Sequence, residues 1–350
     1  MSRPKRGSAR KDKHTARLAA SSGTRQSHAT QLKSPYTPLT KNEQLAIHRA
    51  SLNILETTGM ANATPEIQDV ALANGCFINS DNRLCFPSAL IEDVIANACK
   101  SFVVHARNAD YDFEAKSGQL NLCTGGAAVS MLDLATQTYR PSLLTDIYDL
   151  ARLADRLEHI QWFARPVVAT DVVDMFTLDV NTIIACAAGT QKHIATSICN
   201  GESAEKLVPL LDILAGGEGR FRERPFCTVH ATTVVSPLTF APDTLDVVCQ
   251  AVKSGMPIHS QTGPQAGATA PAALAGTLVQ CCAEGLASLC VINLLQPAHP
   301  VVIGNWAFVS DLRTGAFSGG SGEQALLGAC LLYTSPSPRD QRGSRMPSSA

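Results

Sequence analysis

The stretch MPIHSQTG, Met256 to Gly263, begins as a short apolar strand and ends in polar side chains. A long apolar helix is predicted from Ala272 to Leu295, and the segment before it holds mostly Gly, Ala, Pro and Thr. A buried strand followed by a helix is the repeating unit of a parallel sheet covered by helices. This segment therefore predicts one such unit, with His259 and Gln261 near the carboxyl end of its strand.

The same strand–helix unit recurs about six times between residues 106 and 330. Apolar strands are expected around LNLC, WFARPVVAT, HIATSICN, FCTVHATTVV, MPIHSQTG and PVVIGNWAF, each ahead of a helical pattern. This regular alternation predicts an α/β fold, and no G-x-G-x-x-G turn follows the first strand. The number of units favours a TIM (β/α)₈-type barrel over a doubly wound sheet. Because six units do not close a barrel of eight, we expect an incomplete barrel or an open sheet.

Residues 41–105 have a helical texture and predict an N-terminal helical subdomain ahead of a partial TIM barrel at 106–330. The segment NEQLAIHRASLNILETTGM repeats apolar residues at helical spacing and contains Gly59, a typical C-cap. Two further helices are expected, from Thr64 to Ala73 and from near Pro87, with a small hairpin around Asp81-Asn82 between them.

The two ends of the chain differ in composition from its body. Residues 1–40 are rich in Ser, Thr and Lys, which predicts a basic disordered leader, with an organelle transit peptide as the alternative. The end LLYTSPSPRDQRGSRMPSSA replaces an apolar helix abruptly with Ser, Pro and Arg. We interpret 331–350 as a non-native tail on a C-terminally truncated sequence, with a natural disordered tail as the alternative.

The body of the chain is acidic, although the formal net charge of the whole protein is −1. Residues 1–42 hold ten Lys or Arg and one acid, whereas residues 43–330 hold 28 acidic and 16 basic residues. An acidic body disfavours a nucleic-acid binder. The 12 cysteines lie in apolar runs without a C-x-x-C pair, which predicts buried thiols in a reducing cytoplasm and no metal site. Polar residues interrupt every long apolar run, so no membrane span is expected.

Chemistry in a parallel barrel is expected at the carboxyl ends of its strands. The polar and aromatic side chains predicted there on the last three strands are His230, His259, Gln261, Asn305, Trp306 and Phe308. Any one of them alone could be a satisfied core group, but two histidines and an aromatic pair on adjacent strand ends favour a binding site. Asp171 and Asp174 are expected to be acids at helix N-termini. No nucleophile elbow, P-loop or metalloprotease helix is present, so no catalytic residue is assigned.

The segments HSQTGPQAGATAPAALAGTLVQ and HPVVIGNWAFVSDLRTGAFSGGSGEQAL, in this order, resemble the trimethylamine methyltransferase family. That family includes pyrrolysine-containing enzymes and relatives without pyrrolysine, such as glycine betaine methyltransferases, and the resemblance runs from about residue 40 to 330. It implies a barrel whose mouth receives a methylated amine and a separate corrinoid protein, with cobalt(I) taking the methyl group by in-line attack. The family's barrel continues beyond Gly328, and the pyrrolysine position would lie in that continuation.

The resemblance also implies roles for particular residues. Trp306 and Phe308 are candidates to hold a methylated ammonium group on their aromatic faces. His230, His259 and Gln261 could donate hydrogen bonds to a substrate carboxylate, with Asn305 at the same site. The flat corrinoid would lie near the loop Ala266 to Gly276, which implies cofactor-binding positions at Gly125, Gly126, Gly267, Ala268 and Thr269. A homo-oligomer is expected for the full-length protein.

Two other interpretations stay open from the sequence. An inactive barrel could bind methylated amines without transferring a methyl group. An unrelated TIM-barrel lyase or aldolase would need a metal triad or a Schiff-base lysine at a strand end. Lys192, Lys206 and Lys253 are expected in turns or helices, which disfavours the aldolase.

Overall fold

The computed structural model describes residues 30–31, 36–117, 119–311, 313–316 and 318–334. Most of the expected leader and residues 335–350 of the expected tail lie outside the described residues. The last described helix, α11 (Gly322–Thr334), continues past the boundary at residue 331, and Leu331 is buried in a cluster with Ile47 and Leu278. The division of the chain into leader, subdomain, barrel and tail stays a prediction.

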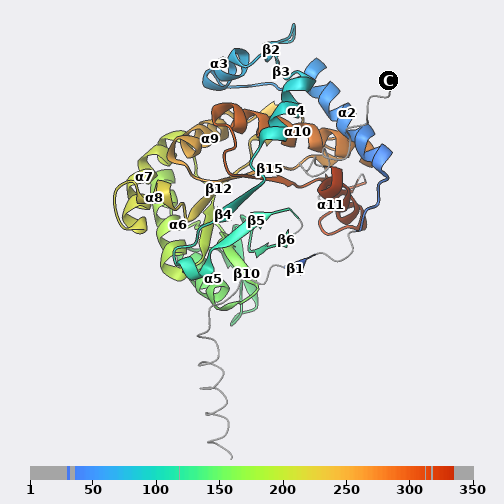
Figure 1. Ribbon diagram of the computed structural model, residues 1–350. Coiled ribbons are helices and arrows are strands. Elements are labelled where there is room, and N and C mark those ends of the chain that lie inside the picture. The colour runs from blue at the N-terminus through green and yellow to red at the C-terminus, as the bar shows by residue number, and fades with distance from the viewer. Residues whose placement is uncertain (1–29, 32–35, 118, 312, 317, 335–350) are drawn as a thin grey trace, which may run out of the picture.

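A six-stranded parallel sheet forms the centre of the molecule, in the order β17-β15-β12-β11-β10-β7 (Figure 1). Each strand pairs with the next strand of the series along the chain, as in a TIM barrel, so the sheet is a partial barrel and the predicted fold class is confirmed. The strands are β7 (Leu122–Cys123), β10 (Ile160–Ala164), β11 (His193–Thr196), β12 (Cys227–Ala231), β15 (Ile258–Thr262) and β17 (Val301–Asn305).

A helix follows every strand of this sheet and covers its outer face (Figure 1). Buried strand residues such as Phe163, Val229 and Ile258 pack against buried helix residues such as Ile183 and Val248. Two of these helices begin at side-chain N-caps, since Asp174 accepts from Thr177 and Asn200 accepts from Ser203. The helices are α5 (Leu144–Arg156), α6 (Met175–Gly189), α7 (Gly201–Ala215), α8 (Arg220–Glu223), α9 (Pro242–Ser254), α10 (Leu274–Leu295) and α11.

The inner face of the sheet is filled by an antiparallel hairpin of β4 (Ser101–Val104) and β5 (Phe113–Lys116). Val104 and Phe113 of the hairpin form a buried cluster with Trp162, Ala164 and Ala195 of the sheet. A single turn of 3-10 helix, Ala109–Tyr111, lies between the two strands. The segment between the two strands contacts the amino end of β11, because the backbone N–H of Asn108 donates to the carbonyl of Gln191 at 3.0 Å.

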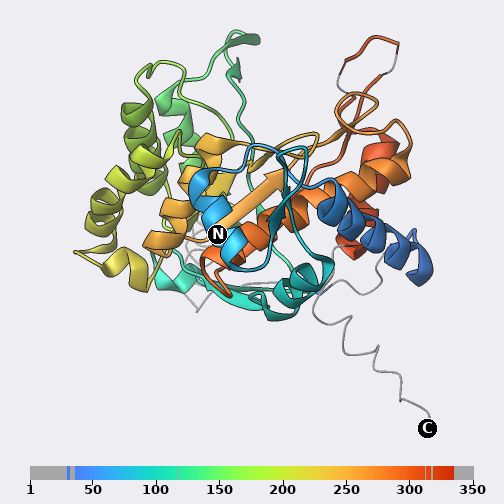
Figure 2. The ribbon, with the colours of Figure 1, turned by 90° about the horizontal axis from the view of Figure 1, so that it is seen from above.

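The N-terminal segment has the predicted helices α2 (Lys41–Thr57), α3 (Pro65–Ala73) and α4 (Ser88–Asn97), with the predicted hairpin β2 (Phe77–Ile78) and β3 (Leu84–Cys85). A capping box of Thr40 and Glu43 starts α2, and Gly59 follows it with a left-handed φ of 67°. These helices share one core with α9 and α10, and α2 lies beside α10 (Figure 2).

Besides the hairpin of β4 and β5, four short strand pairs were not predicted from the sequence. The pair β8–β9 projects from the body between the first strand and its helix (Figure 2). The short strands are β1 (Thr30–Gln31) with β6 (Gln119–Leu120), β8 (Ser130–Asp133) with β9 (Thr138–Pro141), β13 (Val234–Val235) with β14 (Thr239–Phe240), and β16 (Gln265–Ala266) with β18 (Phe308–Val309).

The sequence analysis expected no segment able to span a membrane, but helix α10 is long and apolar enough to do so by length and composition. However, 78% of its most apolar window is buried inside the protein, so α10 is the core helix of this fold. The cysteines follow the same apolar pattern: nine of the 12 are buried, and all are free thiols. Burial raises the pKa of Cys186 to about 12, which keeps this thiol protonated and unreactive.

Candidate functional site

A cavity of about 580 Å³ opens at the carboxyl ends of the sheet strands, where the sequence predicted a site. This volume is typical of a site for a small molecule. Of the predicted positions, His230, His259, Gln261, Asn305, Trp306, Gly125 and Gly126 line it. The remaining lining residues are Cys123, Thr124, Ala127, Ser197, Thr232 and Gly304.

The two histidines form the centre of the cavity wall. His230 and His259 are register partners on β12 and β15, and their rings meet edge to face with centroids 4.8 Å apart. Burial lowers the pKa of His230 to about 3, with a further contribution from His259, and burial lowers the pKa of His259 to about 4. Both imidazoles are therefore neutral at physiological pH, and each carries one N–H donor and one acceptor nitrogen.

One ring nitrogen of this pair is available to a ligand. Nε2 of His230 is buried and has no hydrogen-bond partner among the described residues. On His259 the other ring nitrogen, Nδ1, lies 3.4 Å from Nε2 of Gln261, which is a weak contact. A buried polar atom without a partner costs free energy, so the orphaned nitrogen of His230 favours a bound group that completes it.

Trp162 lies beneath the two histidines and was missed in the sequence analysis. Its ring is 6.2 Å from His259 and 6.4 Å from His230, and 5.6 Å from the buried ring of His193. Alternation along β10 directs Trp162 into the barrel and Phe163 into the helix layer. That alternation is visible in the sequence, but the register that sets which residue points inward is not.

Trp306 forms the rim of the cavity and is 56% exposed. Its backbone N–H donates to the carbonyl of Thr262 at 2.8 Å. Phe308 does not line the cavity; its ring lies 5.7 Å from that of Trp306 at an angle of 50°. The predicted aromatic pair is therefore in contact, with Trp306 facing the cavity and Phe308 supporting it.

Gly304 makes room for one of the imidazoles. A Cβ atom at this position would lie 2.6 Å from Nε2 of His259 and 3.3 Å from Cγ of Gln261. Such distances are shorter than van der Waals contact, so any other residue would displace the ring. On the opposite wall, Gly125 has nothing within 4 Å of the same hypothetical atom, which leaves that side open.

The other three positions expected at a cofactor, Gly267, Ala268 and Thr269, lie in a turn outside the cavity lining. The backbone N–H groups of Ala268 and Thr269 both donate to the carbonyl of Gln265. The carbonyl of Thr269 accepts from Nε2 of Gln280 on α10. The turn is thus packed against the helix layer, and its proposed contact with a cofactor remains a prediction.

The cavity is electrically neutral. Its lining residues include neither an acid nor a lysine or arginine. Asp171 and Asp174 lie at helix N-termini as expected, because Asp171 accepts from the backbone N–H of Leu144 and Asp174 caps α6. Within the described part of the chain, no group of three or more His, Cys, Asp or Glu residues could hold a metal ion.

The lysines proposed for a Schiff base lie away from the cavity lining. Lys192 precedes β11, at the opposite end of the sheet, and is 2% exposed. Its Nζ donates to the carbonyls of Ala154, Leu157 and Ile160 at 2.6–2.8 Å. Lys206 and Lys253 lie in α7 and α9. This placement disfavours the aldolase interpretation.

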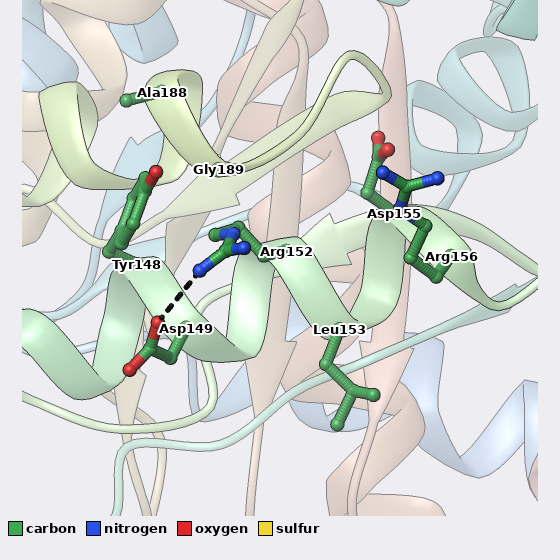
Figure 3. Close-up of a pocket in the computed structure, with 8 residues that line it drawn as sticks. All are labelled: Tyr148, Asp149, Arg152, Leu153, Asp155, Arg156, Ala188 and Gly189. Atoms are coloured by element: carbon green, nitrogen blue, oxygen red, sulfur yellow. Dashed lines mark ion pairs between the residues drawn. The ribbon is translucent and has the colours of Figure 1, made fainter.

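A second cavity of about 410 Å³ lies in the outer helix layer between α5 and α6 (Figure 3). Three of its charged groups have partners in the protein: Arg152 pairs with Asp149 at 3.5 Å and lies over the ring of Tyr148. Asp155 accepts from Thr190 and Gln191. Because this cavity lies in the outer helix layer, away from the carboxyl ends of the strands, the cavity at the barrel mouth is the better candidate site.

Comparison with known proteins gives a family for this chain. The family model described as trimethylamine methyltransferase (MTTB) matches residues 4–331. Trimethylamine methyltransferase MttB of Desulfitobacterium hafniense is 27% identical over 82% of this chain and 58% of that relative. Trimethylamine methyltransferase MttB1 of Methanosarcina mazei is 29% identical over 83% of this chain and 60% of that relative. A glycine betaine methyltransferase of Desulfitobacterium hafniense is 25% identical over 91% of this chain and 64% of that relative.

A solved structure supports the fold. The monomethylamine methyltransferase MtmB of Methanosarcina barkeri matches with a TM-score of 0.55 at 14% identity, over 86% of this chain and 60% of that one. At this identity the likeness concerns the fold alone. The chain spans about 60% of the length of the first relatives it matches.

Proposed function

Because the chain belongs to the trimethylamine methyltransferase (MTTB) family, we propose that it moves a methyl group from a methylated amine to the cobalt of a corrinoid. The corrinoid is carried by a separate partner protein and acts as the methyl acceptor. The single observation that carries the proposal is the neutral cavity at the barrel mouth, with Trp306 at its rim and His230 in its wall.

The absence of charge among the lining residues suits a quaternary ammonium substrate. Aromatic faces bind such a cation without an ion pair, and Trp306 offers the best face for this purpose. When the C–N bond breaks, nitrogen keeps the bonding pair and leaves as a neutral amine, so no general acid is required. Cobalt(I) supplies both electrons of the new bond and becomes methyl-cobalt(III). The protein's own contribution is to hold the methyl group in line with the open mouth.

Donors in the cavity wall favour a substrate that also carries a carboxylate, as a betaine does. Neutral His230 and His259 can each donate one N–H, and Gln261 and Asn305 can donate amide hydrogens. A carboxylate accepts several such bonds at once. Trimethylamine lacks this group and would rely on the aromatic face of Trp306.

Titration of the chain with glycine betaine, trimethylamine and tetramethylammonium by calorimetry, with and without cob(I)alamin, tests the proposal. Binding together with methylcobalamin formation, followed by absorbance, supports a methyltransferase. Binding without methyl transfer would favour the inactive binding barrel, and no binding of any methylated amine would contradict both. We also propose a cytoplasmic location and, for the full-length protein, a homo-oligomer.

A further inference from the structure

Helix α10 buries a carboxylate in the middle of its apolar sequence. Glu284 is 0% exposed and is the one acidic or basic residue among the 22 residues of α10. Its Oε1 accepts from the backbone N–H of Leu238 at 3.1 Å and from Nε2 of Gln280 at 2.9 Å. Its Oε2 accepts from the hydroxyls of Ser236 and Thr262 at 2.7 and 2.9 Å. Four donors thus satisfy this buried carboxylate. Because burying a charged group costs free energy that an apolar side chain would not, packing alone does not explain an acid at this position.

These bonds join the helix to separate segments of the chain. Ser236 and Leu238 belong to the loop after β12, and Thr262 is the last residue of β15. Gln280 extends the network, because its Nε2 also donates to the carbonyl of Thr269 in the turn before α10. Glu284 therefore fixes α10 against the ends of two strands that supply the histidines of the cavity.

The link from Glu284 to the cavity is short. Thr262 follows Gln261 in β15, pairs with Asn305 in the sheet, and accepts the backbone N–H of Trp306 at 2.8 Å through its carbonyl. One hydroxyl bond and one backbone bond thus separate the carboxylate from the residue at the cavity rim.

A second contact from the same turn of α10 reaches the neighbouring strand, β17. A Cβ atom at Gly285 would lie 2.8 Å from Oδ1 of Asn305 and 3.3 Å from Cγ2 of Ile303. The backbone of α10 therefore packs directly on Asn305, beside the point where Glu284 holds Thr262. Glu284 and Gly285 together locate the end of β15 and the end of β17.

We propose that Glu284 is a positioning residue of the cavity, which sets the place of Trp306 through Thr262. It does not touch the substrate, and its role in substrate binding rests on the proposed function above. Without the carboxylate, the hydroxyl of Thr262 loses its acceptor, and the backbone carbonyl that holds Trp306 is free to shift.

The two oxygens of Glu284 make distinct predictions for its variants. Oε1 accepts from two N–H groups, which can only donate a hydrogen bond. Oε2 accepts from two hydroxyls, which can rotate and accept a hydrogen bond instead. Glu284→Gln can place its oxygen at the first position and its NH₂ at the second, so it should preserve the network. Glu284→Met has a similar volume and removes all four bonds. Thr262→Val keeps the shape and backbone of Thr262 and removes its bond to Glu284, together with a weak 4.0 Å contact to Sγ of Cys281.

The test uses Trp306 as its own reporter. The sequence has two tryptophans, so Trp162→Phe leaves Trp306 as the single fluorophore. In that background, acrylamide quenching of Trp306 and calorimetric Kd for glycine betaine are measured for each variant, together with Tm. The matched control is Ser288→Ala, one turn further along α10, which loses buried bonds to Thr233 and to the carbonyl of Glu284.

We expect Glu284→Met and Thr262→Val to change the quenching of Trp306 and to raise Kd about tenfold. Glu284→Gln should behave as the unsubstituted chain, and Ser288→Ala should lower Tm without changing quenching or Kd. The proposal is wrong if Thr262→Val leaves the quenching of Trp306 and the Kd unchanged. It is also wrong if Ser288→Ala changes the quenching and the Kd as much as Thr262→Val does. If Glu284→Met does not fold, the result for Thr262→Val decides alone. If the unsubstituted chain binds no methylated amine, the proposed function fails, while quenching still tests the positioning.

Discussion

His230 on β12 and His259 on β15 are register partners on neighbouring parallel strands, with ring centroids 4.8 Å apart and ring planes at 87°. Trp162 packs beneath both rings, and His193 packs against the other side of that tryptophan. The centre of the partial barrel is thus a cluster of one indole and three imidazoles. A charge on any of these imidazoles would have to be carried in a site with few water molecules.

Acid should destabilise the fold through these histidines. Burial is the main cause that lowers the pKa of His230 to about 3 and the pKa values of His193 and His259 to about 4. Well above pH 6.5 these histidines are unprotonated in both states, but from about pH 6.5 downward the unfolded chain binds more protons than the folded chain. The free energy of unfolding should therefore fall as pH drops from about 6.5 to about 4, at up to about 4 kcal/mol per pH unit for three protons.

Urea unfolding at several pH values within this window measures the slope. Substituting His230→Gln together with His259→Gln should flatten it, since this removes two of the four histidines whose pKa is lowered by burial, the others being His193 and His299. His159→Gln, at an exposed position, is the matched control and should leave the slope as it was. An equal slope in the double variant would show that the loss of stability has another source.

Gly304 should tolerate no side chain, because a Cβ there would lie 2.6 Å from Nε2 of His259. We expect Gly304→Ala to cost about 1–3 kcal/mol of stability and to weaken glycine betaine binding. Gly328→Ala is the control: nothing lies within 4 Å of a Cβ in α11, and alanine should stabilise the helix by about 0.5–1 kcal/mol. Urea midpoints and calorimetry compare the two, and equal stability of both variants would refute the crowding at His259.

Lys192 should act in folding and form no Schiff base. Its ammonium group donates to three backbone carbonyls at the amino end of β11. Lys192→Met removes all three of these charge-assisted bonds and should cost about 3 kcal/mol or more, whereas exposed Lys206→Met should cost about 0.5 kcal/mol at most. Borohydride treatment with pyruvate should add no mass to the chain. A trapped adduct on Lys192 would instead revive the aldolase.

The alternation of strands and helices could be predicted from the sequence because strands buried on both faces form continuous apolar runs. The pair β8–β9 was missed because its strands, Ser130–Asp133 and Thr138–Pro141, are short and half-exposed, with no apolar period. Helix α11 continues past Leu331, although Ser, Pro and Arg follow soon after it, because Leu331 packs against Leu278 of α10 and Ile47 of α2. Such tertiary support is not encoded in a local pattern.

The cavity was partly predictable for a topological reason. Parallel strands bring their carboxyl ends together, so His230, His259 and Trp306 could be grouped without knowing any distance. The turn Gly267–Thr269 could not be placed, because its position depends on the hydrogen bond from Gln280. Glu284 carried a signal that was overlooked: it is a lone acid in a long apolar helix, and such a residue must find buried donors.

Trp306 is the decisive residue for the proposed substrate. It is 56% exposed, so its removal should leave the fold intact while it deletes the aromatic face at the cavity rim. Trp306→Ala should raise Kd for tetramethylammonium about tenfold, equivalent to about 1–2 kcal/mol. Trp306→Phe should recover part of the affinity, because a smaller aromatic face still attracts a cation.

The matched control is Phe77→Ala, which removes a 43% exposed aromatic ring from β2 in the N-terminal segment. Calorimetry with tetramethylammonium and glycine betaine separates the two contributions of the cavity. If the histidines and amides hold a carboxylate, glycine betaine should retain more affinity than tetramethylammonium in Trp306→Ala. Equal affinity of Trp306→Ala and the unsubstituted chain for both ligands would exclude an aromatic cation site at this rim. Equal residual affinity of Trp306→Ala for both ligands would instead show that the carboxylate contributes nothing and would remove the basis for a betaine substrate.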